Sequence, residues 1–141
     1  MRTVIQRRYG GPDVLEVVEI ATPAPGPGQV LVAVRAAALN PIDLAMRAGG
    51  LAGMIGEPFP LGLGWDLAGT VEGVGDDVTG WSVGDAVVGL RDEFVGPTGA
   101  LASHVVLPAE AVAKAPAGVA PEAAATFPLN TLTAHQALDL L

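Results

Sequence analysis

The 141-residue sequence contains no cysteine, which excludes disulfide bonds and every metal site built on cysteine ligands. Only two histidines are present, His104 and His135, so a histidine-rich metal site is not expected either. Lys and Arg number 7 against 15 Asp and Glu, giving a formal net charge of −8, and the basic residues are scattered. A nucleic-acid partner is therefore not expected, because phosphate backbones are bound by clustered basic side chains.

Long apolar segments are also lacking. No apolar run reaches the roughly 18 residues that cross a bilayer. The first residues, with Arg2, Arg7 and Arg8 around a short strand-like stretch, lack the apolar segment of a signal peptide. We therefore expect a cytoplasmic protein with no membrane partner.

The sequence is instead rich in turn-forming residues, with 19 glycines and 12 prolines dispersed among short runs of β-branched and aliphatic residues. Half of the residues are hydrophobic, which suffices for the core of one compact domain. The patterns predict short strands at a similar spacing, which is typical of a β-barrel, and residues 29–37 are predicted as the central strand. The predicted strands cover residues 3–6, 15–20, 29–37, 67–74, 86–90, 103–107 and 111–115.

Helix signals appear first at Asn40, where an N-cap residue is followed by Pro41 in a first-turn position. Gly49 and Gly50 are predicted to end this helix, and residues 51–60 are predicted to form a loop.

The last part of the sequence is alanine-rich and leucine-rich. It predicts a short helix at residues 121–125 and a second helix at residues 129–141, with Asn130 or Thr131 as its N-cap.

Six motifs follow one another in a fixed order along the chain. Each of them occurs in unrelated proteins, but the ordered set is specific. The motifs are Tyr9-Gly10-Gly11-Pro12, Pro25-Gly26-Pro27-Gly28-Gln29-Val30-Leu31-Val32, Asn40-Pro41-Ile42-Asp43, Gly64-Trp65-Asp66-Leu67-Ala68-Gly69, Val83-Gly84-Asp85 and Leu132-Thr133-Ala134. This ordered set resembles the zinc-free quinone oxidoreductase branch of the medium-chain dehydrogenase/reductase superfamily.

The resemblance implies a mainly β fold, a GroES-like partly open β-barrel with short helices. Residues 1–125 would form this catalytic domain, and residues 126–141 a linking helix that leads toward a Rossmann domain. The glycine-rich turn that binds the pyrophosphate of a dinucleotide does not occur in this sequence. We therefore expect the nucleotide-binding half to come from a further segment or a partner chain.

The resemblance also implies site residues. It places Asn40 beside the nicotinamide ring of NADPH, Thr133 at the nicotinamide carboxamide and Gln136 further along the same helix as a third cofactor contact. Trp65 stands where the zinc relatives have a histidine ligand, which implies a place near the reaction cleft and no metal. Each has an alternative role: Asn40 as an N-cap, Thr133 as a cap or packing residue, and Trp65 as ordinary core.

Asp66 and Asp85 are candidate catalytic acids by residue type, but we expect them to cap turns. We expect Gly64, Gly69, Gly73 and Gly75 to permit tight turns and close approach of the backbone. The zinc relatives hold an acid near the metal at the place of Asp66. His104 is predicted to be structural.

Two other positions bear on acid catalysis. Many relatives carry an aromatic residue soon after the place of Asp43, where this chain has Leu44 and Ala45, so acid catalysis by tyrosine is not expected. His135 occupies a place where relatives often have tyrosine, and it is predicted to be a solvated helical residue.

The implied function is NADPH-dependent reduction of a quinone or an α,β-unsaturated carbonyl by metal-free hydride transfer, with solvent supplying the proton. The chain alone is expected to be inactive. An open barrel seam would expose apolar surface, so a homo-oligomer is predicted. The alternative is a GroES-like binding or co-chaperone module without catalysis, for which residues 51–55 are the candidate contact loop.

Overall fold

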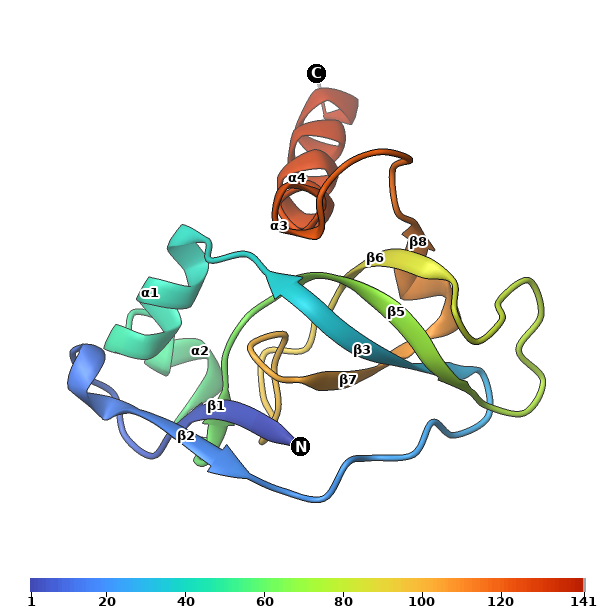
Figure 1. The fold of residues 1–141 in the computed structure, drawn as a ribbon. Helices are drawn as coiled ribbons and strands as arrows, with labels where there is room; N and C mark the ends of the chain where they lie inside the picture. Colours follow the sequence, from blue (N-terminus) through green and yellow to red (C-terminus); the bar gives the residue numbers. More distant parts are fainter. Residues whose placement is uncertain (141) are drawn as a thin grey trace.

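The computed structural model describes residues 1–140, and its centre is a sheet of five antiparallel strands in the order β7-β3-β5-β6-β8. The strand β3 runs beside β5 across the middle of the molecule (Figure 1). The five strands are β3 (Gln29–Ala37), β5 (Asp66–Val74), β6 (Ala86–Leu90), β7 (His104–Pro108) and β8 (Val112–Lys114).

A second, smaller sheet has the order β2-β1-β4, with β1 (Arg2–Gln6), β2 (Leu15–Glu19) and β4 (Leu61–Gly62). A single bridge between Thr3 and Ala102 connects it to the segment before β7. The two sheets do not close on one another. The predicted mainly β, partly open barrel is therefore confirmed.

The predicted central position of residues 29–37 is confirmed, because β3 pairs with β7 on one side and β5 on the other. Val30, Leu31 and Val32 are all buried, so this part of the strand is covered on both faces. The main core lies here. Its fully buried members include Val30, Val32, Leu67, Val71, Val87 and Leu107.

Glycine permits two close approaches within this core. A Cβ atom at Gly69 would overlap the carbonyl oxygen of Ala33 on the neighbouring strand. Gly64 has a φ of +95°, and a Cβ there would lie 2.6 Å from the backbone nitrogen of Leu101. The predicted backbone role of these two glycines is confirmed.

Two helices lie beside the smaller sheet (Figure 1): α1 (Pro41–Ala48) and α2 (Ala52–Ile55). The first begins after Asn40 and ends at Gly49, whose φ of +90° forms the predicted C-cap. The second corrects the predicted loop 51–60. Leu51 and Ile55 pack on a core cluster there, which counts against a mobile contact loop.

The C-terminal part forms α3 (Pro121–Ala124) and α4 (Phe127–Asp139). The helix α4 begins two residues before its predicted start, so Asn130 and Thr131 lie inside it and the prediction that one of them is the cap is wrong. Pro128 in the first turn fits this earlier start, because proline lacks the N–H that the first turn leaves unpaired. The predicted end at Leu141 lies outside the described residues.

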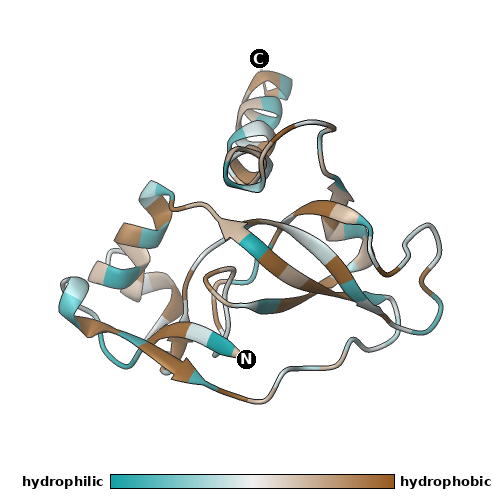
Figure 2. Cartoon of the chain, viewed as in Figure 1, coloured by the Kyte–Doolittle hydropathy of each residue, from teal (hydrophilic) through white to brown (hydrophobic). Residues whose placement is uncertain are grey.

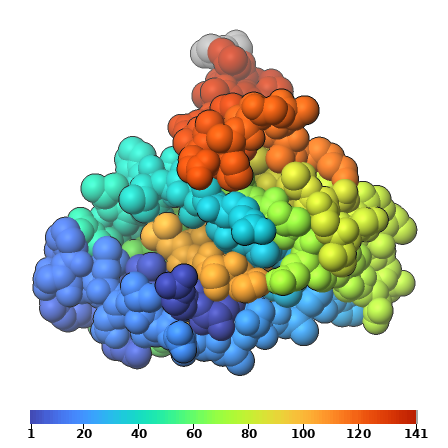
Figure 3. Space-filling model, in the orientation of Figure 1, coloured from blue at the N-terminus to red at the C-terminus, as the bar shows by residue number. Residues whose placement is uncertain are grey.

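The helix α4 projects from the body of the molecule (Figures 1 and 3). Its residues from Asn130 onward are all exposed. The opposite edge of the molecule is formed by β2, where Figure 2 shows apolar residues on an outer strand. Val17 is 71% exposed there, while Glu16 and Glu19 place charge beside it.

Candidate functional site

Two of the predicted site residues meet in a cavity of about 440 Å³ between the first turn of α1 and one side of α4. Asn40 lies on the α1 side and Thr133 on the α4 side. The remaining lining residues are mostly apolar: Pro41, Ile42, Leu129, Asn130, Ala134 and Ala137. We refer to this space as the α1/α4 cavity.

Asn40 is the N-cap of α1, as predicted, and only 6% of it is exposed. The backbone N–H of Asn40 donates to Oδ2 of Asp43 at 2.8 Å. The side-chain Nδ2 donates to Oδ2 of Asp66 at 2.9 Å. The amide of Asn40 is thus fixed from the barrel side, at the wall of the α1/α4 cavity.

Asp66 does not cap a turn, and that prediction is wrong. It is fully buried at the start of β5, and its Oδ1 accepts the backbone N–H of Leu129 at 2.7 Å. Leu129 lies in the first turn of α4, where N–H groups have no partner within the helix. Asp66 therefore caps a distant helix, and it joins that helix to Asn40.

Asp43 is the second buried acid near the α1/α4 cavity. Besides the N–H of Asn40, it accepts the N–H of Gly64 through Oδ1 at 2.9 Å. Burial raises the pKa of Asp43, an effect that its hydrogen bonds oppose and the charge of Asp66 reinforces. Burial likewise raises the pKa of Asp66, against the hydrogen bonds from Asn40 and Leu129. Both acids sit where a negative charge is costly.

Asp85 behaves as predicted. Its Oδ2 accepts the N–H of Ser82 at 2.9 Å, which closes the turn before β6. The same oxygen lies 2.7 Å from Nζ of Lys114. The hydrogen bond from Lys114, followed by that from Ser82, lowers the pKa of Asp85.

Trp65 lies in the core and does not line the α1/α4 cavity. It is buried with Met46, Leu61 and Leu63. The ring of Phe94 meets it edge-on, with the ring centroids 4.9 Å apart. The contacts of Trp65 therefore agree with its alternative role as an ordinary core residue.

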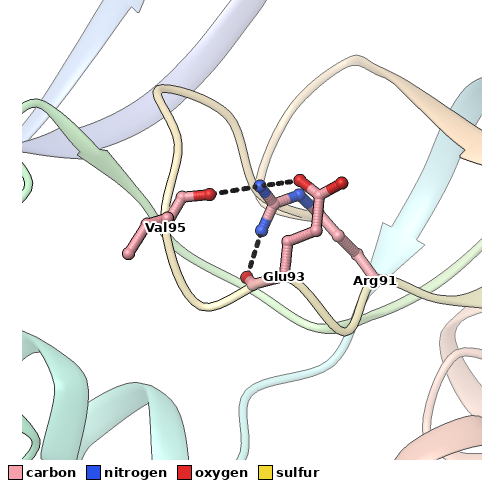
Figure 4. A network of polar contacts seen from close by, with 3 residues as sticks. All are labelled: Arg91, Glu93 and Val95. Atoms are coloured by element: carbon pink, nitrogen blue, oxygen red, sulfur yellow. Dashed lines mark hydrogen bonds and ion pairs between the residues drawn. The ribbon is translucent and has the colours of Figure 1, made fainter. Parts of the chain in front are cut away.

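The loop that carries Phe94 is held by Arg91, a buried cation that sequence reasoning missed. Nη1 of Arg91 donates to the carbonyl oxygen of Glu93, and Nη2 donates to Oε2 of Glu93 and to the carbonyl oxygen of Val95 (Figure 4). The run Arg91-Asp92-Glu93 after a strand marks a charged turn. It does not reveal that backbone carbonyls are the acceptors.

The remaining predicted residues lie on exposed surface or in ion pairs. Thr133 is exposed at the α1/α4 cavity, whereas Gln136 is exposed without lining it. His135 is an exposed helical residue, as predicted. Its Nε2 lies 3.5 Å from Oδ2 of Asp139. His104 is structural, as predicted, with Nε2 2.8 Å from Oε2 of Glu72.

A larger cavity of about 630 Å³ was not predicted from the sequence. It lies between β6, β8 and the first turns of α4, and its walls include Val88, Val112, Phe127 and Leu132. Within residues 1–140, no group of three or more His, Cys, Asp or Glu side chains could hold a metal ion. No helix in this range is long and apolar enough to cross a membrane.

Comparison with known proteins places the barrel in a family. Residues 26–117 match the model of the alcohol dehydrogenase GroES-like domain. A quinone-oxidoreductase homolog from the chloroplast of Spinacia oleracea is 38% identical over 129 residues, which cover 92% of this chain and 39% of the relative.

Two solved structures are similar along nearly the whole chain. The quinone oxidoreductase of Coxiella burnetii superposes with a TM-score of 0.89 at 32% identity, covering 99% of this chain and 44% of that one. The Escherichia coli quinone oxidoreductase in complex with NADPH has a TM-score of 0.84 at 31% identity, covering 98% and 40%.

The predicted resemblance to the quinone oxidoreductase branch is confirmed by these relatives. The chain spans about two fifths of the length of each of them. By its sequence match and by its fold, the chain belongs to the alcohol dehydrogenase GroES-like domain family.

Proposed function

We propose that this chain is the catalytic-domain portion of an oxidoreductase that uses NADPH to reduce quinones or α,β-unsaturated carbonyls. The observation that carries the proposal is the α1/α4 cavity, in which Asn40 and Thr133 face one space from two different elements. The NADPH complex of a relative with the same fold supports the choice of cofactor.

The residues of the α1/α4 cavity fit a nicotinamide group. An amide from Asn40 and a hydroxyl from Thr133 are hydrogen-bonding partners for a carboxamide. Ile42, Leu129 and Ala134 supply apolar walls for a flat ring. When bound, the cofactor supplies the hydride.

The chain's own residues act by position. Asn40, held by Asp66, presents a fixed amide at the cavity wall, while the Thr133 hydroxyl fixes the opposite side of the ligand. Orientation of this kind lowers the barrier without any covalent step by the protein.

We infer the substrate class from the reaction that the cavity residues permit, a direct transfer of hydride. A quinone or the β-carbon of an α,β-unsaturated carbonyl accepts hydride directly, and solvent then supplies the proton. The spinach, Coxiella and Escherichia relatives are named as quinone oxidoreductases or a homolog of one, which supports a quinone acceptor. The resemblance puts Trp65 at the place of a zinc ligand, and its burial among apolar side chains supports a metal-free site.

The rest of the cofactor needs a second binding surface. The helix α4 projects from the barrel with its outer turns exposed, and we propose that it leads to the nucleotide-binding half, supplied by a further segment or a partner chain. The greater length of the relatives supports this proposal.

The first experiment is a titration of this chain with NADPH, followed by quenching of Trp65 and Trp81 fluorescence. No saturation below millimolar NADPH is expected for the chain alone. Saturable micromolar binding would overturn the need for a second half.

A chimera tests the activity itself. Residues 1–140 replace the equivalent domain of the Escherichia coli quinone oxidoreductase, and oxidation of NADPH is followed with quinone and enone acceptors. The chimera is expected to oxidise NADPH with an acceptor of one of these classes. A folded chimera that binds NADPH but reduces neither class would contradict the proposed function. Thr133→Val is the matched variant, and it should weaken NADPH binding without unfolding the helix.

A further inference from the structure

We propose that Asp66 is the positioning residue of the α1/α4 cavity, where its single carboxylate fixes the Asn40 amide and docks the first turn of α4. The distance between Asn40 and Thr133 would then be set by Asp66, which does not line the cavity itself. The role of that distance in cofactor binding rests on the proposed function, whereas the contacts of Asp66 are independent of it.

The two oxygens of Asp66 serve two different elements. Oδ2 accepts from Nδ2 of Asn40 at 2.9 Å, and Oδ1 accepts from the backbone N–H of Leu129 at 2.7 Å. Asn40 lies 26 residues before Asp66, and Leu129 lies 63 residues after it. One side chain therefore holds both walls of the cavity, the cap of α1 and the start of α4.

Few hydrogen bonds but several apolar contacts fix α4, and Leu129 itself packs on the core cluster that contains Trp65. Within the described residues, the bond from Leu129 to Asp66 is the one hydrogen bond that joins α4 to the barrel. Ala124 and Ala125, just before the helix, pack on Ala68 and provide an apolar anchor. Residues 130–140 are exposed, so the direction of the helix depends on this short docking region.

The arrangement demands a carboxylate. Two N–H donors converge on Asp66, and an ionised carboxylate offers an acceptor oxygen to each. An asparagine offers one acceptor and one NH₂ group, so it would lose one of the two bonds and oppose a donor with a donor. A glutamate keeps both acceptors on a longer side chain.

The electrostatic surroundings make this carboxylate responsive to pH. From α1, the facing ionisable group is Asp43, a second acid. On α4, the ionisable residues His135 and Asp139 lie on the exposed outer turns. No Lys, Arg or His in residues 1–140 forms an ion pair with Asp66. Protonation of Asp66 would replace one acceptor by a donor and loosen one of its two contacts.

The test is NMR spectroscopy of the 141-residue chain without NADPH, so its outcome does not depend on cofactor binding. The side-chain amide of Asn40 and the backbone amide of Leu129 should titrate together, with one midpoint above the ordinary pKa range of aspartate. Asp66→Asn should abolish this common titration. It should also speed hydrogen exchange at Leu129 by about tenfold or more, the effect of one lost hydrogen bond.

Two variants complete the design. Asp66→Glu should retain a common titration, and Asp85→Asn, which changes an acid that caps a turn elsewhere, should change neither signal. If Asp66→Asn does not fold, the wild-type titration decides. Separate midpoints for Asn40 and Leu129, or no titration of either, would overturn the proposal, as would unchanged exchange at Leu129 in a folded Asp66→Asn.

Discussion

Two acids and one amide form a buried polar chain at the residue scale. The N–H of Gly64 and the N–H of Asn40 both donate to Asp43, and the side chain of Asn40 donates onward to Asp66. Each buried carboxylate thus accepts two hydrogen bonds, but no cation balances either charge among the contacts of the described residues. Hydrogen bonds reduce the cost of burying a charge without removing it.

The pKa of Asp66 makes a prediction about stability and pH. Burial raises the pKa of Asp66 in the folded chain above its ordinary value of 3.8. A raised acid stabilises the fold fully at pH values below the ordinary pKa, and this contribution is lost as pH rises through the folded-state value. The free energy of unfolding of the wild type minus that of Asp66→Asn should therefore decrease as pH rises above about 4.

Urea denaturation of both proteins from pH 3.5 to pH 7 gives this difference, because titrating groups that do not interact with Asp66 cancel. Asp43 does interact with it, and its raised pKa changes the difference in the same direction. The corresponding comparison with Asp85→Asn should change in the opposite direction, since Lys114 and Ser82 lower the pKa of Asp85. A difference for Asp66 that grows with pH would mean that the hydrogen bonds from Asn40 and Leu129 outweigh burial.

At the element scale, the local sequence pattern predicted the strands well but did not predict the contacts between elements. The predicted limits of β3 and β6 match the structure, because each is an apolar run bounded by turn residues. The two residues of β4 are too few to show any period. In α4, the cap signals at Asn130 and Thr131 were overridden by Pro128 and by Asp66, which satisfies the helix start from another part of the chain.

The candidate site likewise contains residues that the sequence predicted and a contact network that it did not. Motif order was enough to place Asn40 and Thr133, which do share a cavity. The role of Asp66 could not be predicted, because its spacing within Gly64-Trp65-Asp66-Leu67-Ala68-Gly69 describes only local neighbours. Its partners come from elsewhere in the chain, and only the folded arrangement of β5, α1 and α4 brings them together.

The loop after β6 carries a prediction about Arg91. Its guanidinium group is the shared donor for the carbonyl oxygens of Glu93 and Val95, and this holds Phe94 against Trp65. In Arg91→Ala, we expect the loop to loosen, with a loss of about 1–3 kcal/mol in the free energy of unfolding. The emission of Trp65 should shift to longer wavelength as water reaches the indole.

A Trp81→Phe background isolates the signal of Trp65 for this measurement. Glu93→Gln is the matched control, because it removes the side-chain charge at an exposed position but keeps the carbonyl acceptor. It should lower stability less than Arg91→Ala does, because the two backbone carbonyl acceptors of the guanidinium group stay in place. Unchanged Trp65 emission in Arg91→Ala would show that Phe94 keeps its place without the cation.

The whole molecule leaves apolar surface on two opposite parts, the edge strand β2 and the projecting helix α4. On β2, the exposed Val17 stands between Glu16 and Glu19, and charges of this kind discourage pairing of edge strands. On α4, Leu132 and Leu138 are exposed, with Leu138 at 67%. The outer turns contain one long contact, between His135 and Asp139 at 3.5 Å, and no buried side chain. The helix is therefore the better candidate for covering by another protein surface.

The predicted homo-oligomer can be assigned to a surface on this basis. The chain should self-associate through α4, and association should strengthen with salt, because salt screens the repulsion between copies that each carry a net charge of −8. Leu138→Lys should shift the equilibrium toward the monomer in sedimentation velocity runs across a range of concentrations. Val17→Lys is the matched change on β2 and should leave the equilibrium as it is. If only Val17→Lys gives the monomer, the edge strand β2 forms the contact and the helix α4 does not. A wild-type chain that is monomeric at every concentration would contradict the predicted homo-oligomer, because both apolar surfaces would then remain uncovered.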